Sequence, residues 1–422
     1  MKKHKNYYFA TKNRSLSFSA LEGDAKADVC IIGAGFTGLG AALELIGKGY
    51  KVAILEAAEV GHGASGRNGG QVASGYSAGM MEAARIVGAA DAALLWQFSE
   101  EAKEILHARL EQHKIDCDFR WGEYYAAPKK SHLDWLKAER EFVEKSYGYE
   151  KYRWVDEPGM REILAGDRYI GALLDLEGGH LHPLNYLLGL AEAVSTRGGM
   201  IFENSAAISF TEGKSLKIQT EKGEVSADVL ILAGNAYLKN LAPKLFNRMV
   251  PIKSSILATE PLGSERAASL MKTTACVADT YFDLDYFKMA PDTRLIYGGR
   301  DFSFGRSTLQ NNAVRDNMLK TFPMLQNVKI DYLWSGQLSI TRQRLPDVGQ
   351  LHKNVFYAHG YSGQGVPLSA IVSRVLAEAV DGQLSRFDVF NRIPHKKVPR
   401  SKALQVPLYH LVLLWNRIKD ML

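Results

Sequence analysis

Three glycines and one acid have the types and the spacing that can hold a dinucleotide. Gly33, Gly35 and Gly38 stand in G-x-G-x-x-G spacing, and Glu56 lies 23 residues after Gly33. In such a motif the first glycine permits a tight turn, the second leaves room for a pyrophosphate, and the third lets a helix pack closely on a strand. The acid accepts hydrogen bonds from ribose hydroxyls. These residues predict binding of NAD or FAD, and they do not decide between the two.

The flanking sequence supplies the elements that must position this motif. Val29–Ile32 is a short apolar run, which is typical of a strand buried on both faces. Apolar residues at three- and four-residue intervals follow Gly35 and predict a helix, and Val52–Leu55 predicts the next strand. The positive end of that helix favours a pyrophosphate. Residues 27–56 are therefore predicted to form a complete βαβ unit.

Two further glycine-rich segments favour FAD. Residues 61–71 read GHGASGRNGGQ, and their backbone amides, with Ser65, Arg67 and Asn68, could neutralise a pyrophosphate and reach a flavin ring. The alternative for this segment is a flexible surface loop. Residues 359–365 read HGYSGQG and join a predicted strand to a predicted helix, with a packing role expected for His359. Glycine-rich turns that feed helices from opposite ends of the chain fit a long, extended FAD better than NAD.

Strand and helix patterns far apart in the chain predict an α/β fold with two domains. Val229–Ala233 and Val355–Ala358 are strand-like runs that end at glycine-rich loops, whereas residues 250–345 are rich in short strand-like runs and turns. We predict a discontinuous Rossmann-like FAD-binding domain and a second α+β substrate domain built on an antiparallel sheet. The expected boundaries are an N-terminal arm lying on the surface at 1–25, the FAD-binding domain at 26–90, 150–242 and 346–390, the substrate domain at 91–149 and 243–345, and a basic segment with an amphipathic helix at 391–422.

Composition excludes several other classes of protein. Hydrophobic residues make up 46% of the 422 residues and charged residues 23%, which excludes a disordered chain, a fibre and a small disulfide-stapled scaffold. The net charge of +6 comes from two basic terminal segments, 1–14 and 392–402, rather than from a basic face. No nucleic acid is therefore expected as a partner.

Cysteine and histidine spacing gives no sign of disulfides or of a metal. The three cysteines, Cys30, Cys117 and Cys276, are far apart, and no run approaches the length of a membrane span. His180 and His182 have H-x-H spacing without a third ligand nearby, so no metal site is expected. These features predict a reduced, cytoplasmic location.

Strings distributed along the chain resemble the FAD-dependent D-amino-acid-oxidase/glycine-oxidase superfamily, and within it the gamma-glutamylputrescine oxidoreductase group. The resemblance extends from about Tyr7 to Leu422. It implies a two-domain fold with substrate held between the flavin and a β-sheet, and oxidation of a C–N bond. The strings are the G-x-G-x-x-G unit, GASGRNGGQ, HLHPLNYLLGLAEA (180–193), LAGNAYL (232–238), ATEPLG (258–263), LDYFK and RLIYGGR (284–300), and GYSGQGV.

The resemblance implies a set of FAD-binding residues. Many relatives carry His where this chain has Gln364, a departure expected to alter flavin tuning or substrate access. Some members hold the flavin through a Cys shortly before the late strand; residues 338–350 contain none, so FAD is expected to bind non-covalently. The residues implied are Gly33, Gly35, Phe36, Thr37, Gly38, Glu56, Ala64, Ser65, Arg67, Asn68, Gly69, Gln71, Gly234, Ser362, Gly363, Gln364 and Gly365.

Substrate-binding residues are expected in the second domain, near the matching strings. No catalytic residue is assigned, because the flavin carries the difficult chemistry. The alternative for each candidate is an ordinary structural role. The candidates are Tyr286, Arg300, Trp334 and Arg342, of which either arginine could hold a substrate carboxylate, and Asp283 or Asp285, which could attract a distal ammonium.

The expected reaction is oxidation of an amine, with gamma-glutamylputrescine as the leading candidate. The product imine would be hydrolysed to aldehyde and ammonia, and oxygen would reoxidise the flavin. One alternative is a D-amino-acid or N-methyl-amine dehydrogenase that passes electrons to a membrane quinone, and another is a flavin-binding redox sensor without turnover. Residues 406–422 could form an amphipathic helix in weak contact with a membrane, or one that docks on its own protein.

Overall fold

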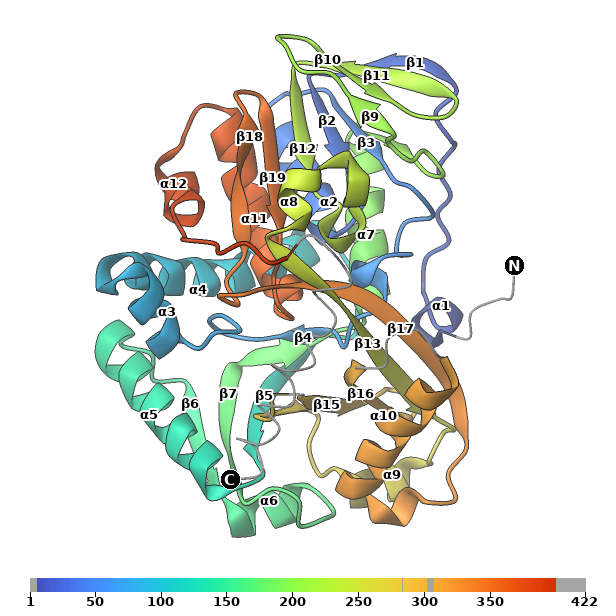
Figure 1. The fold of residues 1–422 in the computed structure, drawn as a ribbon. Coiled ribbons are helices and arrows are strands. Elements are labelled where there is room, and N and C mark those ends of the chain that lie inside the picture. Colours follow the sequence, from blue (N-terminus) through green and yellow to red (C-terminus); the bar gives the residue numbers. More distant parts are fainter. Residues whose placement is uncertain (1–5, 283, 302–306, 400–422) are drawn as a thin grey trace.

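The computed structural model describes residues 6–282, 284–301 and 307–399, in which three sheets organise the chain. A six-stranded sheet with its helices forms the upper half of the molecule in Figure 1, and a nine-stranded sheet spans the lower half. A four-stranded sheet lies at the top. The C-terminal helix predicted within 406–422 lies outside the described residues.

The six-stranded sheet has the order β18-β19-β12-β2-β3-β8. All pairs are parallel except β18 with β19. Every residue of β2 and β3 is buried, as expected for parallel strands covered on both faces. The strands are β2 (Val29–Ile32), β3 (Val52–Leu55), β8 (Met200–Phe202), β12 (Val229–Leu232), β18 (Asp347–His352) and β19 (Val355–His359).

Alternate side chains of β2 enter two different cores, because successive residues of a strand point to opposite faces. Val29 and Ile31 pack with three helices, α2 (Phe36–Gly47), α7 (Pro183–Thr196) and α11 (Gly365–Val380). Cys30 and Ile32 pack with the four-stranded sheet. That sheet consists of β1 (Gly23–Lys26), β9 (Ser209–Phe210), β10 (Leu216–Gln219) and β11 (Gly223–Ala227). Residues 206–226 contain short alternating runs split by turn signals, which predict a small antiparallel meander, and β9, β10 and β11 confirm it, with β1 added in parallel.

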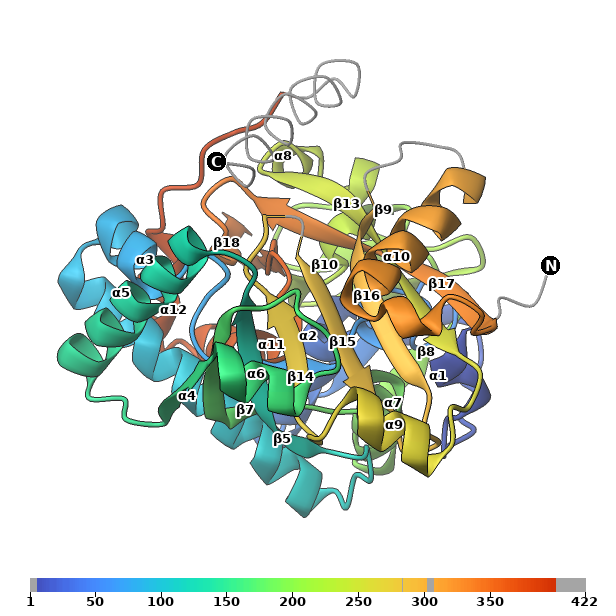
Figure 2. The ribbon, with the colours of Figure 1, turned by 90° about the horizontal axis from the view of Figure 1, so that it is seen from below.

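The nine-stranded sheet is mostly antiparallel, with one parallel pair between β5 and β14. Helix α10 (Ser307–Thr321) packs on its outer face through Val314 and Met318, and α9 (Ser264–Leu270) packs on the same core through Leu270; Figure 2 shows both helices on the side of the sheet that faces the viewer. The inner face points toward the six-stranded half. The strands are β4 (Gln71–Val72), β5 (Arg120–Ala127), β6 (Tyr152–Asp156), β7 (Gly171–His180), β13 (Met249–Thr259), β14 (Cys276–Asp279), β15 (Asp285–Met289), β16 (Leu295–Asp301) and β17 (Ile330–Thr341).

Three elements lie in a different half of the molecule from the one expected. Strands β6 and β7 fall within 150–242, which was predicted as FAD-binding, yet β7 pairs with β4, β5 and β6 in the nine-stranded sheet. Helix α4 (Ala89–Gln112) begins the segment predicted as substrate domain, yet it packs on α11. Strand pairing and helix packing over long sequence separations are not encoded in the local pattern, which explains both differences.

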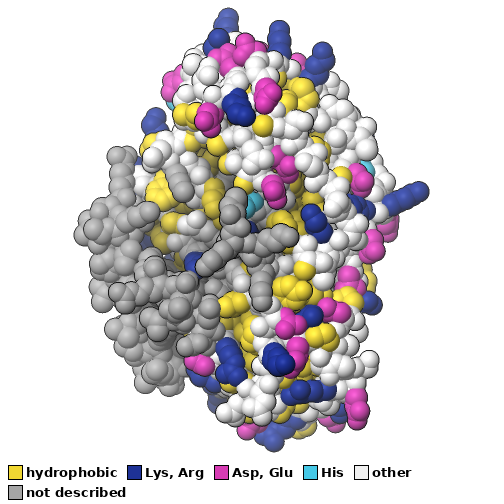
Figure 3. Space-filling model, turned by 90° about the vertical axis from the view of Figure 1, so that its right-hand side faces the viewer, with side chains coloured by type: hydrophobic (Ala, Val, Ile, Leu, Met, Phe, Trp, Pro, Cys, Tyr) yellow, Lys and Arg dark blue, Asp and Glu magenta, His cyan; other side chains and the backbone are white. Residues whose placement is uncertain are grey.

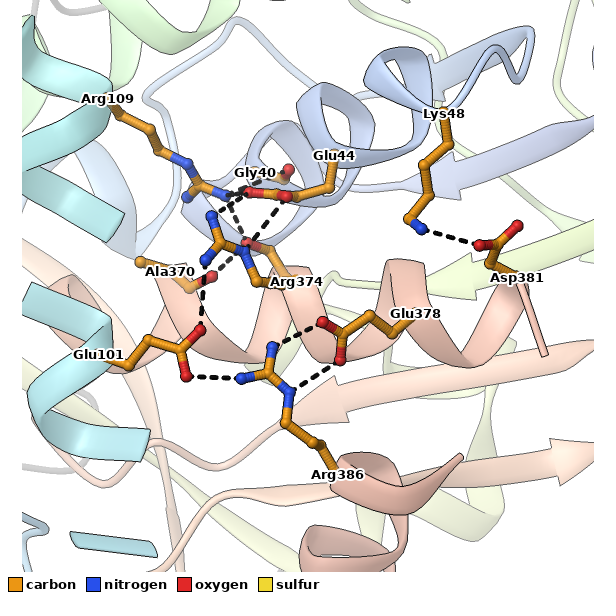
Figure 4. Close-up of polar contacts among 11 residues, drawn as sticks. Gly40, Glu44, Lys48, Glu101, Arg109, Ala370, Arg374, Glu378, Asp381 and Arg386 are labelled. Atoms are coloured by element: carbon orange, nitrogen blue, oxygen red, sulfur yellow. Dashed lines mark hydrogen bonds and ion pairs between the residues drawn. The ribbon is translucent and has the colours of Figure 1, made fainter. Parts of the chain in front are cut away.

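Charged side chains tie α4 to the helices of the six-stranded half (Figure 4). The Arg109 guanidinium lies 2.9 Å from Glu44 of α2, and Arg374 of α11 lies 3.2 Å from Glu101 of α4. Although burial alone would raise the pKa of Glu44, Arg109 and Arg374 hold it below its usual value. Arg386 of α12 (Ser385–Asn391) completes the set, 2.7 Å from Glu378. These pairs fix the packing of α2, α4 and α11.

The remaining helices are short, apart from α5. On the face in Figure 3, basic and acidic side chains of the described residues are interspersed. Within the described part of the chain, no helix is long and apolar enough to cross a membrane. The remaining helices are α3 (Met80–Val87), α5 (Lys130–Tyr147), α6 (Glu157–Ile163) and α8 (Pro243–Phe246), and there are 3-10 turns at Ala64–Gly66, Asn235–Tyr237, Lys239–Leu241 and Pro323–Leu325.

Residues 10–20 of the N-terminal segment lie exposed or half-buried on the surface, whereas Tyr7 and Tyr8 are buried and anchor the segment, which the prediction of a surface arm did not include. Helix α1 (Tyr7–Ala10) begins after Asn6, whose side chain accepts a hydrogen bond from the Tyr8 amide at 2.9 Å. The Tyr8 side chain is 1% exposed and packs edge-on against His182 and Trp334. Tyr7 and Tyr8, two adjacent residues of a polar segment, are therefore buried between the two halves of the molecule.

Replacement of Tyr8 tests this anchoring. The ring is buried, whereas its hydroxyl has no hydrogen-bond partner among the described residues. Tyr8→Ala is expected to lower the free energy of unfolding by about 3–5 kcal/mol, because a buried ring is lost. Tyr8→Phe, the matched control, is expected to leave it unchanged or raise it, since an unsatisfied hydroxyl is removed. Urea denaturation monitored by circular dichroism would measure both, and equal stability of Tyr8→Ala and the native chain would contradict the anchoring.

Candidate active site

The first glycine-rich turn fits a close approach between helix α2 and strand β2. Gly33 has a φ of +106°, and a Cβ there would lie 3.0 Å from the carbonyl oxygen of Ala233. A Cβ on Gly38 would overlap the carbonyl oxygen of Gly33. Both positions therefore require glycine, and the backbone that results forms a cradle for a pyrophosphate at the N-terminus of α2.

Glu56 is fixed at the same edge of the sheet. Its carboxylate accepts hydrogen bonds from the amides of Ala34, at 2.9 Å, and Ala58, at 3.0 Å. A carboxylate has about four acceptor sites, so two occupied by amides leave capacity for ribose hydroxyls. This geometry fits the adenosine end of a dinucleotide.

The segment 61–71 folds over the cradle through its own side chains. Ser65 Oγ accepts a hydrogen bond from the amide of Phe36 at 3.1 Å, which joins the segment to the start of α2. The Asn68 amide donates to the carbonyls of Ala64 and Ser65, both at 3.0 Å, and its oxygen accepts from the Gly70 amide at 2.8 Å. The Asn68 side chain is therefore used to shape the segment, which is an ordered loop.

The nine-stranded sheet supports this loop from below. The Tyr286 ring of β15 packs on Gly69, and the carbonyl of Leu181 and the Lys288 amine pack on Gly70, so that no Cβ fits at either glycine without displacement. Trp334 of β17 donates its indole N–H to the carbonyl oxygen of Arg67 at 3.0 Å. The loop is thus held between α2 and the sheet.

The late turn closes the opposite side. Ser362 and Gly363 have φ values of +57° and +114°. Ser362 Oγ donates to the carbonyl of Gly360 at 3.0 Å, and the hydroxyls of Tyr361 and Thr37 are 2.7 Å apart. The last contact links the two ends of the site across most of the sequence. His359, just before the turn, is buried with Nε2 2.8 Å from Asp347, which accords with the packing role expected for it.

One cavity of about 590 Å³ runs along these elements and continues over the nine-stranded sheet. All of the residues implied for FAD binding line it except Gly38, which lies behind the turn and permits the packing of α2 on β2. The glycine cradle, the acid at the end of β3 and the ordered loop together fit FAD. Their individual contacts with the cofactor stay predictions.

The cavity brings together only part of the predicted substrate set. Tyr286 lines it, with its hydroxyl 3.1 Å from Ser254 Oγ. Trp334 is buried behind the loop and Arg342 is exposed, and neither lines the cavity. Arg344, two residues further on with a φ of +56°, lines it instead. The residue that reaches the cavity thus differs from the one expected because the backbone turns left-handed at this point.

The other substrate candidates, Asp283, Asp285 and Arg300, are not among the described residues that line the cavity. Asp285 points into the outer layer, where its carboxylate lies 2.8 Å from Arg168. Arg300 is in β16 opposite Ser254, and its side chain lies outside the described residues, as does Asp283.

Sequence reasoning missed an acid on β5. Glu123 lines the cavity and is 2% exposed, and its cross-strand partner is Asp175 of β7. Burial, which is the larger cause, and the nearby Asp175 carboxylate raise the pKa of Glu123 to about 8. Asp175 accepts hydrogen bonds from Ser74 at 2.6 Å and Tyr149 at 2.5 Å. Glu123 therefore holds a proton at neutral pH. The sequence signal that could have revealed it is an acid inside the apolar and aromatic run 122–127.

The two histidines and a buried lysine beneath the loop have structural partners. His180 Nε2 lies 2.8 Å from the carbonyl of Thr274, and His182 Nδ1 accepts from the Asn185 amide at 3.1 Å. Lys288 donates to the carbonyl of Leu181 at 2.7 Å, and burial lowers its pKa to about 8. Among the described residues, no three His, Cys, Asp or Glu side chains gather in a way that could hold a metal ion.

Fold and site together define a flavoenzyme, and comparison with known proteins supports this. The model of the FAD-dependent oxidoreductase (DAO) family matches residues 28–379, and the chain belongs to that family. The resemblance seen in the sequence is thereby confirmed, as is FAD as the cofactor. The Rossmann-like expectation for the fold is confirmed as well.

Particular relatives cover nearly the whole chain. Gamma-glutamylputrescine oxidoreductase of Escherichia coli is 38% identical over 419 residues, 99% of this chain and 98% of that protein. A probable oxidoreductase of Haemophilus influenzae is 39% identical over 400 residues, 94% of this chain and 91% of that protein. The structure of glycine oxidase from Geobacillus kaustophilus superposes with a TM-score of 0.73 at 19% identity, covering 87% of this chain and 100% of that one, which shows a shared fold.

Gly38→Ala tests the cradle. A Cβ at this position overlaps backbone, and overpacking of this kind costs about 1–3 kcal/mol, so FAD affinity is expected to fall by roughly tenfold or more. Gly47→Ala, in the last turn of the same helix, is the control because nothing lies within 4 Å of a Cβ there. Titration of apoprotein with FAD, followed by flavin fluorescence, would measure both affinities. Equal affinities would show that the approach of α2 to β2 does not shape the cofactor site.

Glu123 gives the protein a pH-dependent stability. Its pKa is raised from 4.5 to about 8, so between these values the folded chain keeps a proton that the unfolded chain has lost. The free energy of unfolding therefore falls as pH rises through this window, by up to about 1.4 kcal/mol per pH unit from this group. Glu123→Gln is expected to remove that loss. Its gain in stability over the native chain is therefore expected to be larger at pH 8 than at pH 5. Thermal unfolding at both pH values measures it; an unchanged difference in Tm would refute the assignment.

Proposed function

We propose that this protein oxidises a C–N bond of a small amine, with gamma-glutamylputrescine as its leading substrate. The observation that carries the proposal is the continuous cavity, which leads from the glycine cradle and Glu56 to a lobe over β5, β14 and β15. A cofactor in the cradle and a substrate in the lobe would share one space. The name of the Escherichia coli relative supports this choice of substrate.

The bound flavin would supply the acceptor for a hydride from the carbon next to the amine nitrogen. The chain's own residues position the amine and shield it from water. Tyr286 and Tyr125 line the lobe together with Ala278, and these three stand side by side on β15, β5 and β14. They offer a flat, largely apolar surface on which a substrate chain can lie.

The charge of the lobe suits a reaction that requires a neutral amine. A fixed carboxylate beside the reacting nitrogen would hold it protonated. Glu123 lies on β5, two strands from Tyr286 on β15, so its carboxyl is not beside the reacting nitrogen, and in the free protein its pKa of about 8 keeps it uncharged at neutral pH. Arg344 takes the role expected of Arg342, since its side chain lines the cavity and offers a guanidinium to a substrate carboxylate. Hydrolysis of the imine to aldehyde and ammonia, and reoxidation of the flavin by oxygen, belong to the same proposal.

Anaerobic reduction of the flavin tests the proposed function. The purified holoprotein is mixed without oxygen with gamma-glutamylputrescine, putrescine, glycine, sarcosine or D-alanine, and the flavin absorbance is followed. We expect gamma-glutamylputrescine to bleach the flavin fastest, and admission of air to restore the colour with release of the aldehyde. Bleaching by glycine or sarcosine alone would overturn the choice of substrate, and bleaching by none would overturn amine oxidation.

Acid precipitation tests non-covalent binding. All three cysteines are buried, and none of them lines the cavity wall formed by the described residues. We therefore expect trichloroacetic acid to release all of the flavin into the supernatant and to leave a colourless pellet. A yellow pellet would show a covalent link to the chain.

A further inference from the structure

The inner lobe of the cavity combines one acid with several aromatic rings. Glu123 lines it with Tyr125, Tyr152 and Trp135, and Leu173 completes the wall. A carboxylate placed among aromatic faces is the chemistry that recognises an ammonium group, through a charge-assisted hydrogen bond and cation–π attraction.

The other acids that line the cavity already have strong partners. Asp279 pairs with Arg168 at 3.3 Å. Glu139 accepts hydrogen bonds from the amides of Met80 and Met81, which begin α3, and Glu56 accepts two from backbone amides. Glu123, in contrast, accepts a long hydrogen bond of 3.4 Å from the Tyr125 hydroxyl, and no closer partner of its carboxyl is found among the described residues. A buried acid facing a cavity with so weak a partner has acceptor capacity for a ligand.

The position of Glu123 separates it from the place where the reacting carbon must lie. The flavin-facing loop touches the sheet at Tyr286 of β15, through Gly69. Strand β5, which carries Glu123, is separated from β15 by β14. Neighbouring strands are about 4.8 Å apart, so the two strands are roughly 10 Å apart. A group bound at Glu123 is therefore at the far end of an extended substrate rather than at its reacting amine.

We propose that Glu123 binds a second, non-reacting ammonium group of the substrate and so selects amines that carry two cationic nitrogens. This inference rests on the proposed amine oxidation and adds its specificity. For gamma-glutamylputrescine the group bound is the α-ammonium of the glutamyl end, and for a simple diamine it is the distal amine.

The groups around Glu123 are consistent with this role. Asp175 of β7 and Tyr152 of β6 are its neighbours on one side, Cys276 of β14 on the other, and Lys103 of α4 approaches through Ser74. In the free protein the pKa of Glu123, about 8, keeps this side chain uncharged, so it adds no negative charge beside Asp175. An arriving ammonium favours the ionised carboxyl, and Glu123 then releases its proton.

The test uses two pairs of amines that differ only in the second ammonium. One pair is gamma-glutamylputrescine and N-(4-aminobutyl)glutaramate, which lacks the α-amino group. The other pair is putrescine and n-butylamine. Anaerobic rates of flavin reduction at limiting amine are measured for the native holoprotein, Glu123→Gln and Glu123→Asp. The flavin content of each variant is first matched to that of the native protein.

In its better pair, the native protein is expected to react roughly 10- to 100-fold faster with the member that carries two ammonium groups, which is the range for a hydrogen bond to a charged group. Glu123→Gln is expected to lose this preference, because its rate falls far more with the member that carries the second ammonium group than with the member that lacks it. Glu123→Asp keeps the charge and is expected to retain part of the preference, which separates recognition from a folding defect.

Three outcomes overturn the inference in distinguishable ways. An equal loss of rate with both members of a pair in Glu123→Gln would show a merely structural role. A preserved preference in that variant would place the second ammonium elsewhere. Failure of all four amines to reduce the flavin of the native protein would overturn the proposed amine oxidation itself, and this inference with it.

Discussion

The meeting of strand ends at one edge of the six-stranded sheet is the constraint on which the rest of the structure depends. Strands β2, β3, β12 and β19 run parallel, so the residues that follow them come together although they lie far apart in sequence. Gly33, Glu56, Gly234 and the turn residues 361–365 line one cavity for this reason. The hydrogen bond between Thr37 and Tyr361 is the most direct sign of the convergence.

The loop 61–71 turns this edge into an enclosed site, because it is packed from two sides. Ser65 joins it to α2, and the indole of Trp334 joins it to the nine-stranded sheet. Tyr8 in turn packs on Trp334, so the N-terminal helix stabilises the loop from behind. The two halves of the molecule are therefore coupled through the segment that we expect to face the cofactor.

The βαβ unit, both glycine-rich turns and the meander could be predicted from sequence because each is a local pattern. Membership of β6 and β7 in the nine-stranded sheet could not, since it depends on pairing with β5 and β4. The candidate cofactor residues, which all line the cavity except Gly38, followed from motifs, whereas the candidate substrate residues depend on which side chain of a turn or strand faces inward. Arg344, a left-handed residue, lines the cavity where Arg342 was expected to, and Glu123 faces inward through the register of β5 with β7. Burial of Tyr8 in a polar segment is a tertiary effect of the same kind.

The central claim is that flavin and amine share one cavity, with the flavin ring against the 61–71 loop and the substrate extended over β5, β14 and β15. A crystal structure of the FAD-loaded protein, reduced without oxygen and soaked with gamma-glutamylputrescine, tests it most directly. The account predicts the adenosine at Glu56, the flavin ring beside Gly69 and Tyr286, and the far end of the amine within hydrogen-bond distance of Glu123. Density for the amine outside this lobe, or for FAD outside the glycine cradle, would contradict the account.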